Sequence, residues 1–144
     1  MLIALALALA TAECAAFTLK DTTGKLHRLA DYKGRWVVLN YWATWCAPCV
    51  REIPEIAAFQ RARSDAVVIG IATDAEDVDT TRKFAKKVGH DYPLVISDDE
   101  VEKQFPALKG LPTTRIYDPT GRVVYDRLGP VSGKLLSEAT TRKP

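Results

Sequence analysis

The chain has 144 residues, which suffices for a single domain with a substantial apolar core. Its 47% hydrophobic and 26% charged residues are the proportions of an ordinary globular protein rather than a disordered or fibrous one. With 20 basic against 18 acidic residues and no basic block, the composition is not that of a nucleic-acid-binding protein, so we expect no nucleic-acid partner. Three cysteines are also too few for a scaffold held together by disulfides.

An apolar stretch opens the chain. Residues 2–10 contain only Leu, Ile and Ala, and Ala10-Thr11-Ala12 is a small-x-small site at which a signal peptidase could cut. The stretch is too short for a transmembrane helix, which needs about 20 apolar residues. We therefore predict a signal peptide or hydrophobic leader at residues 1–12, a single domain at residues 13–144, and a periplasmic or otherwise extracytoplasmic location. A membrane anchor and a buried N-terminal helix remain alternatives, because no Lys or Arg precedes the apolar run.

Cys14 follows the proposed cleavage site. Its position suggests lipid attachment, but Glu13 occupies the preceding position, where a lipid-attachment motif requires a small residue. An incidental thiol close to the terminus is therefore the favoured interpretation.

The first half of the domain shows strand patterns followed by one helical pattern. Residues 17–20 and 26–29 flank a group of turn residues and predict a β-hairpin. The aromatic and β-branched run at 35–42 is typical of a central strand that is covered on both faces. After Cys46 the apolar residues recur at helical spacing, and we expect Pro54 to kink this helix.

The second half alternates between strands and helices. In chain order, we expect a strand at 66–72, a helix at 76–88, a strand at 92–96, a short helix at 100–105, strands at 113–118 and 122–126, and a helix at 132–140. This alternation of strands and helices predicts an α/β fold in which helices flank a mixed central sheet.

The pentapeptide Trp45-Cys46-Ala47-Pro48-Cys49 carries the clearest chemical signal. Cys46 falls where the predicted strand ends and the helix begins, and the amide dipoles and free N–H groups of a helix N-terminus stabilise a thiolate. This position predicts Cys46 as the nucleophile and Cys49, one turn inside the helix, as a more buried resolving thiol. Because the intervening Ala-Pro pair contains no His or Lys, we expect a reducing rather than a strongly oxidising couple.

The same cysteine spacing also occurs in zinc sites, where two thiolates form half of a tetrahedral ligand set. Two further ligands would have to come from Cys14, His27 and His90, none of which stands in a paired spacing. We therefore predict no bound metal and no cofactor, and we assign both histidines to the surface.

The segment Gly110-Leu111-Pro112-Thr113 is a second candidate element of the site. A proline immediately before a strand fits a cis X-Pro bond in a turn. If this turn faces the cysteines, its backbone could pair with an extended substrate chain. The candidate substrate-binding residues are therefore Trp45, Leu111, Pro112 and Thr113.

Together, Trp42-Ala43-Thr44-Trp45-Cys46-Ala47-Pro48-Cys49 and Gly110-Leu111-Pro112-Thr113-Thr114 resemble the thioredoxin superfamily, and more narrowly the exported TlpA/ResA/CcmG-like thiol-disulfide oxidoreductases. The similarity extends over residues 16–140. It implies a thioredoxin fold with an N-terminal β-hairpin extension and a central βα-type insert at residues 72–94. It also implies that Cys46 is the nucleophile, that Cys49 resolves the mixed disulfide and that Pro112 is in cis.

One position departs from the cytosolic thioredoxins, which carry a buried Asp six residues before the first Cys. Here that position is Asn40, which cannot accept a proton. The resemblance instead implies an acidic residue in the insert, matched by Glu76, whose carboxylate would exchange a proton with Cys49. The alternative is that Glu76 only caps its helix. Glu52 and Pro54 also match the family's helix, with expected roles in shape and surface rather than in proton transfer.

The resemblance implies a catalyst of dithiol–disulfide exchange that reduces disulfides in exported proteins. In the resembled group the substrates are apocytochrome c haem-site cysteines or partners in copper-enzyme maturation, and a membrane electron donor of the DsbD/CcdA type returns the electrons. An alternative is a thioredoxin-fold metallochaperone that binds copper or zinc through the CxxC thiolates, although Sco-like chaperones place three residues between their cysteines. A peroxiredoxin is disfavoured because Ala43 stands where such a site needs Thr.

Overall fold

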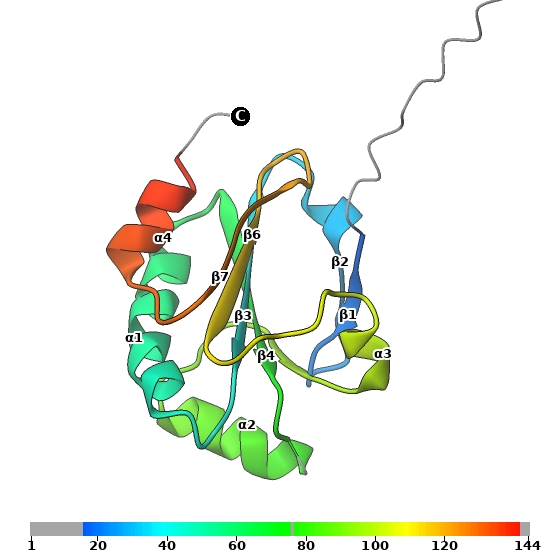
Figure 1. Ribbon diagram of the computed structural model, residues 1–144, viewed down its shortest axis with the longest axis vertical. Coiled ribbons are helices and arrows are strands. Elements are labelled where there is room, and N and C mark those ends of the chain that lie inside the picture. The colour runs from blue at the N-terminus through cyan, green and yellow to red at the C-terminus, as the bar shows by residue number, and fades with distance from the viewer. Residues whose placement is uncertain (1–15, 76, 142–144) are drawn as a thin grey trace, which may run out of the picture.

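The centre of the fold is a five-stranded mixed sheet with the strand order β5-β4-β3-β6-β7. The computed structural model describes residues 16–75 and 77–141, and every structural statement below refers to those residues. The strands are β3 (Trp36–Trp42), β4 (Ala66–Ala72), β5 (Leu94–Ile96), β6 (Thr113–Tyr117) and β7 (Val123–Leu128). Strands β3, β4 and β5 run parallel, whereas β6 and β7 join antiparallel (Figure 1). The mixed sheet predicted from the order of elements is therefore confirmed.

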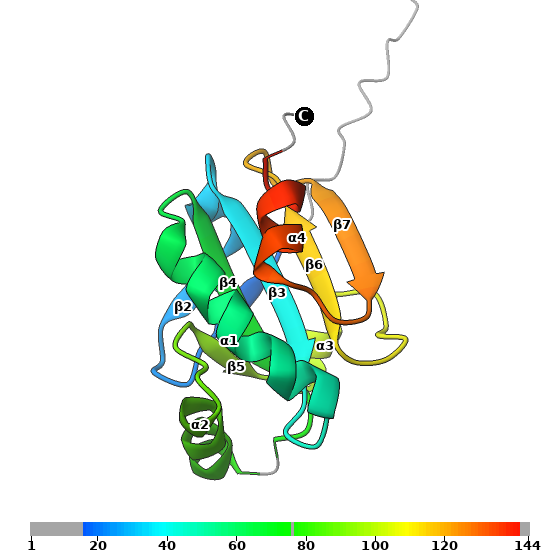
Figure 2. The ribbon, with the colours of Figure 1, turned by 90° about the vertical axis from the view of Figure 1, so that its left-hand side faces the viewer.

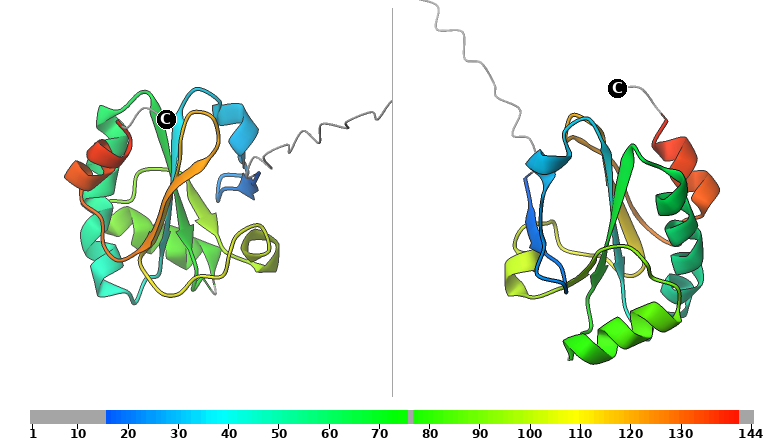
Figure 3. Two further views of the ribbon diagram at one scale, coloured as in Figure 1. Left: turned by 45° about the horizontal axis from the view of Figure 1, so that its top comes forward. Right: turned by 180° about the vertical axis from the view of Figure 1, so that it is seen from behind.

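Two layers cover this sheet (Figures 1 and 2). One face carries two helices, α1 (Ala47–Ala62) and α4 (Gly133–Ala139). The other face carries the hairpin of β1 (Thr18–Lys20) and β2 (Leu26–Arg28), the 3₁₀ helix η1 (Leu29–Tyr32) and the short helix α3 (Asp99–Glu102). Helix α2 (Val78–Lys87) lies at the end of the sheet where α1 begins, as the view from behind in Figure 3 also shows.

Strand β3 alternates its side chains between the two layers. Val37, Leu39 and Tyr41 join the core on the hairpin side, whereas Trp36 and Val38 join the core under α1 and α4. Every residue of β3 is buried, which confirms the prediction of a central strand covered on both faces. Removal of this apolar surface from water on two sides anchors β3 in the sheet.

Several helix boundaries differ from those that the sequence predicts, because capping side chains set them. Helix α2 begins at Val78 rather than at residue 76, since the Asp77 carboxylate accepts a hydrogen bond from Thr80 N. Helix α3 begins at Asp99 and is shorter than predicted, with Asp98 as its N-cap. The 3₁₀ helix η1 stands where the sequence suggests only a turn.

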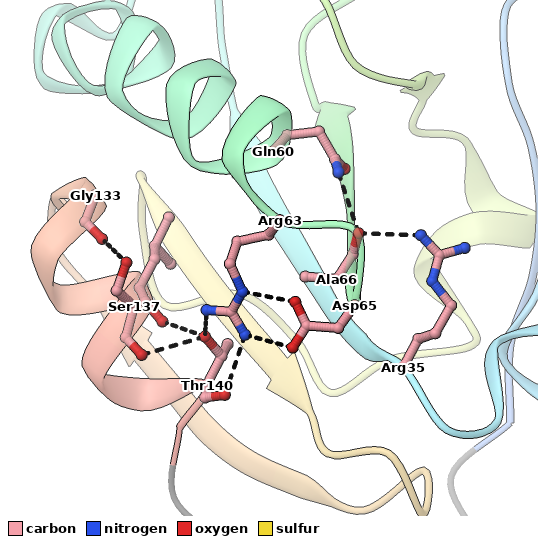
Figure 4. Close-up of polar contacts among 9 residues, drawn as sticks. Arg35, Gln60, Arg63, Asp65, Ala66, Gly133, Ser137 and Thr140 are labelled. Carbon is pink, nitrogen blue, oxygen red and sulfur yellow. Dashed lines mark hydrogen bonds and ion pairs between the residues drawn. The ribbon is translucent and has the colours of Figure 1, made fainter.

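Helix α1 is anchored at its C-terminal end, away from the cysteines (Figure 4). Arg63, the residue after the helix, donates from its guanidinium to the Asp65 carboxylate and to Thr140 Oγ1 at the end of α4. Gln60 adds a hydrogen bond to the carbonyl of the first residue of β4. The helix runs through Pro54 without ending there, and the kink expected at that residue stays a prediction.

Both histidines are buried, so their assignment to the surface is wrong. His27 is 1% exposed and links the hairpin to η1, with Nε2 at 2.8 Å from Asp21 Oδ2 and Nδ1 bonded to Tyr32 Oη. His90 is 8% exposed and packs against Tyr92, with ring centroids 3.8 Å apart. In each case a polar or aromatic side chain contacts the imidazole in place of water.

Gly70 in β4 provides a test of the packing around His90. A Cβ added at Gly70 would overlap Nε2 and Cε1 of His90. We expect Gly70→Ala to lower the free energy of unfolding by about 1–3 kcal/mol, the usual cost of overpacking a core, as measured by urea denaturation. Gly133→Ala is the matched control, because a Cβ there would meet Glu55 O at an ordinary 3.6 Å. Equal stabilities for the two variants would contradict this placement of His90.

Candidate active site

Cys46 and Cys49 form a disulfide at the junction of β3 and α1, with an S–S distance of 2.04 Å and Cα atoms 5.2 Å apart. Cys46 is the N-cap of α1, and its Sγ accepts a hydrogen bond from Cys49 N at 3.3 Å. In the reduced protein this sulfur would lie at the positive end of a 16-residue helix, where a thiolate is stabilised. Cys46 is 4% exposed and Cys49 0% exposed, so Cys49 is the more deeply buried of the two.

Trp45 projects from the surface beside the disulfide and is 72% exposed. The preceding residue holds this loop in place, because Thr44 donates to the Asp74 carboxylate from its backbone N and, at 2.6 Å, from Oγ1. An open groove of about 710 Å³ runs beside the ring and is lined by Thr44, Trp45, Asp74, Asp77, Thr80, Thr81 and Phe84. The site therefore combines a disulfide with an adjacent exposed aromatic ring and a groove.

The loop before β6 packs against the apolar cluster that contains the disulfide. The Leu111–Pro112 peptide bond is cis, as the resemblance implies. Because Tyr41 pairs with Thr113 in the antiparallel ladder, this loop is level with the end of β3 that leads to Cys46. Leu111 packs against the apolar cluster that contains both cysteines. The two sequence motifs therefore meet at one end of the sheet.

Internal hydrogen bonds hold most of this loop. Thr113 is 5% exposed and donates from Oγ1 to Gly110 O at 2.8 Å, while Pro112 O accepts from Gly129 N at 2.8 Å. Within the described part of the chain, no hydrogen bond engages the backbone of Leu111. The loop thus has a fixed shape, and in it the backbone N–H and C=O of Leu111 are free to pair with another chain.

Glu52 belongs to the same region, which corrects the surface role predicted for it. It is 3% exposed, and its two oxygens accept hydrogen bonds from Asn40 Nδ2 at 2.8 Å and from Val131 N at 2.7 Å. Burial raises the pKa of this carboxyl, and the two hydrogen bonds oppose that rise. Residues three apart share a face of an α-helix, so Glu52 lies one turn from Cys49 on the same face. That spacing from Cys49 is the sequence signal that could have marked Glu52 as a candidate site residue, although it does not indicate burial.

The predicted proton-exchanging residue Glu76 lies outside the described residues, as do the leader at residues 1–12 and Cys14. The role of Glu76 therefore stays a prediction. The N-cap of α2 is its neighbour Asp77, whose carboxylate accepts from Thr80 N at 2.7 Å.

Among residues 16–75 and 77–141, no group of three or more His, Cys, Asp or Glu side chains is arranged to hold a metal ion. Over the same ranges, no helix has both the length and the apolar character needed to cross a membrane.

Comparison with known proteins identifies relatives that match most of this chain. A family model described as the AhpC/TSA family matches residues 10–126. The thiol-disulfide oxidoreductase ResA of Bacillus subtilis (strain 168) is 33% identical over 123 residues, which cover 85% of this chain and 69% of that protein. ResA of Geobacillus thermodenitrificans (strain NG80-2) is 34% identical over 111 residues, which cover 74% of this chain and 62% of that protein. The match thus spans about two thirds of the length of these relatives.

A solved structure agrees with this relationship. The crystal structure of a thiol:disulfide interchange protein of the thioredoxin family from Chlorobium tepidum TLS is similar to this chain with a TM-score of 0.78 at 28% identity. The similarity covers 88% of this chain and 91% of that one. The thioredoxin fold implied by the two motifs is therefore confirmed, together with its N-terminal hairpin.

The buried Glu52 should make stability depend on pH. A carboxyl whose pKa in the folded protein exceeds its ordinary value of 4.5 stabilises the fold below that value. This contribution is lost as the pH rises from 4.5 toward the raised pKa. Relative to Glu52→Gln, which cannot ionise, the wild type should lose stability over that interval, with a slope of at most about 1.4 kcal/mol per pH unit.

Urea unfolding at a series of pH values measures this difference. Glu138→Gln, the same change at an exposed carboxyl on α4, is the matched control. Parallel changes in the wild type and Glu52→Gln at every pH would show that the Glu52 carboxyl is not buried as described.

Proposed function

The chain belongs to the AhpC/TSA family and to the ResA-like thiol-disulfide oxidoreductases, and from this membership we propose that it reduces disulfides in exported proteins. The observation that carries the proposal is the Cys46–Cys49 pair at the N-terminus of α1, with the cis-Pro112 loop packed beside it. Such a pair exists either as a dithiol that can donate two electrons or as the disulfide described above.

In the proposed cycle, the Cys46 thiolate attacks one sulfur of a partner disulfide. A bond forms between Cys46 Sγ and that sulfur, and the other partner sulfur leaves as a thiolate and takes up a proton. Cys49, as a thiolate, then attacks Cys46 Sγ, which releases the second partner thiol and forms the Cys46–Cys49 disulfide. Two electrons pass from this chain to the partner, and a dithiol donor must return them before the next turnover.

The second step requires a proton acceptor, because Cys49 must lose its proton in a buried environment. We assign Glu52 a share in this transfer, since it lies on the same face of α1 one turn away. Its raised pKa brings its proton affinity closer to that of a thiol. Glu76, the residue implied by the resemblance, is the second candidate.

The proposed substrate contacts are Trp45, Leu111, Pro112 and Thr113. Trp45 offers an exposed ring beside the groove, and Leu111 offers a backbone N–H and C=O that have no hydrogen-bond partner among the described residues. An extended substrate segment could pair with this backbone next to the cis bond while its cysteine reaches Cys46. Thr113 directs its hydroxyl inward, so its part would be to shape the loop.

The proposed setting is extracytoplasmic. Within it we propose apocytochrome c haem-site cysteines or partners in copper-enzyme maturation as substrates, and a membrane electron donor of the DsbD/CcdA type as the source of electrons. The relatives reported above are named for thiol–disulfide chemistry, so the metallochaperone alternative has no support from them.

Removal of the resolving thiol should trap the partner. In Cys49→Ser, Cys46 can attack a partner disulfide but the mixed disulfide cannot be resolved, so covalent adducts should accumulate in the native host. Non-reducing electrophoresis would show them as higher-mass species that disappear on reduction, and mass spectrometry would identify the partner. Cys46→Ser is the control and should give no adduct. Adducts in equal yield from both variants would contradict the assigned roles.

Turnover of a model protein disulfide tests the site directly. With excess dithiothreitol as donor, the wild type should accelerate the reduction of insulin, and Cys46→Ser should fall to the uncatalysed rate. Trp45→Ala should slow reduction by about tenfold while changing the free energy of unfolding by less than about 0.5 kcal/mol, because the ring is largely exposed. A wild type that consumed peroxide faster than it reduced disulfides would contradict the proposal.

A further inference from the structure

Four buried polar atoms belong to side chains of β3 and of the segment after α2. Among the described residues, none has a hydrogen-bond partner: Asn40 Oδ1, Trp42 Nε1, His90 Nε2 and Tyr92 Oη. Buried polar groups are nearly always hydrogen-bonded, because an unpaired one costs about 1–3 kcal/mol. Several unpaired polar atoms on neighbouring side chains therefore suggest one shared hydrogen-bonding partner.

The strand register brings three of these atoms together. Asn40 in β3 pairs with Gly70 in β4, and side chains of paired residues in neighbouring parallel strands point to the same face. A Cβ on Gly70 would overlap His90 Nε2 and come within 3.0 Å of Tyr92 Cε2. The two rings therefore occupy the space over Gly70, one strand away from Asn40. Neighbouring strands lie about 4.8 Å apart, so the Asn40 side chain is adjacent to the two rings on this face.

The two rings present their polar atoms in a fixed orientation. His90 packs on Tyr92 and also lies against Trp42, with ring centroids 5.5 Å apart, and both His90 and Tyr92 are buried. Burial lowers the pKa of His90 to about 4, so its imidazole is neutral at pH 7. A neutral imidazole nitrogen can accept a hydrogen bond.

We propose that Asn40, His90 and Tyr92 bind one internal water, and that this water positions Asn40 against Glu52. Asn40 Nδ2 already donates to Glu52 Oε1 at 2.8 Å and to Thr114 Oγ1 at 3.2 Å, so Asn40 Oδ1 faces away from the carboxylate and requires a donor. A water that accepts from the Tyr92 hydroxyl can donate one hydrogen to Asn40 Oδ1 and the other to His90 Nε2. All three atoms are then satisfied.

This inference deepens the proposed function and rests on it, because Glu52 is the carboxylate assigned to proton transfer with Cys49. Hydrogen bonds in a chain polarise one another, so a donor to Asn40 Oδ1 strengthens the bond from Asn40 Nδ2 to Glu52. His90 and Tyr92 are thus positioning residues that act on the site through Asn40.

The charged groups around Glu52 are negative, so the stability of the Glu52 anion depends on these hydrogen bonds. Glu55 on α1 disfavours the Glu52 anion, and Asp91 adds negative charge beside the two rings. Within the described ranges, no Lys or Arg forms an ion pair with Glu52. The stabilising contacts are the donors Asn40 Nδ2 and Val131 N, and the water acts on the first of them.

Two variants that keep an aromatic ring test the water site. His90→Phe and Tyr92→Phe each remove one polar partner of the water, so the Glu52 carboxyl should titrate at higher pH than in the wild type. Carboxyl ¹³C NMR of the oxidised protein measures this titration without any turnover. Tyr117→Phe is the matched control, because it removes a buried phenol oxygen on the hairpin side of the sheet and should leave the Glu52 titration unchanged.

Tyr92→Phe deletes a single oxygen and keeps the experiment decisive if His90→Phe does not fold. An unchanged Glu52 titration in folded Tyr92→Phe would overturn the inference, and so would an equal shift in Tyr117→Phe. Because the titration needs no activity, a wild type that reduces no disulfide but shows the expected shifts would overturn the proposed function and still support the water site.

Discussion

The pairing of β3 on both sides is the constraint on which the site depends. It joins β4 along one edge and β6 along the other, and all its residues are buried, so a change of register would expose core on both faces. Its C-terminal end delivers Cys46 to the start of α1, and its antiparallel partner brings the Pro112 loop to the same level. Main-chain hydrogen bonding of the sheet, rather than side-chain contact, therefore sets the distance between the redox pair and the loop beside it.

The same strand introduces polarity into the interior. Asn40 interrupts an apolar run on the face toward α1, and the Glu52 carboxylate on that helix is its partner. Burial of a carboxylate costs more than one amide hydrogen bond returns, so this pair is a poor choice for stability alone. A charge in a low-dielectric interior does, however, respond strongly to a change of charge on a neighbouring thiol. Because Glu52 lies one turn from Cys49, the Asn40–Glu52 pair can respond to the charge of the Cys49 thiol. An apolar pair such as Leu–Leu at the same positions could not.

Elements whose signal is local could be predicted from the sequence. The strands at 36–42 and 66–72 follow from continuous apolar runs, and both redox-site motifs are short enough to recognise without the fold. The burial of Glu52 could not be predicted in this way, because one of its partners lies twelve residues earlier and the other close to the end of the chain. The same holds for His27 and His90, whose surroundings are assembled from separate turns. Whether a polar residue can be buried depends on its contact partners, and those partners are not adjacent to it in the sequence.

The two sulfurs of the disulfide divide the proposed chemistry between the surface and the interior. Cys49 has no exposed surface and lies in the cluster with Trp42 and Ile53, so an incoming thiolate can reach only Cys46. Substrate reduction and reduction by the electron donor must then both pass through Cys46, and the two partners must compete for the same surface. The proton transfer proposed for Glu52, in contrast, involves buried side chains on the inner side of the disulfide. The proton affinity of the interior can therefore be set by Asn40 and its neighbours without any change in the surface that partners recognise.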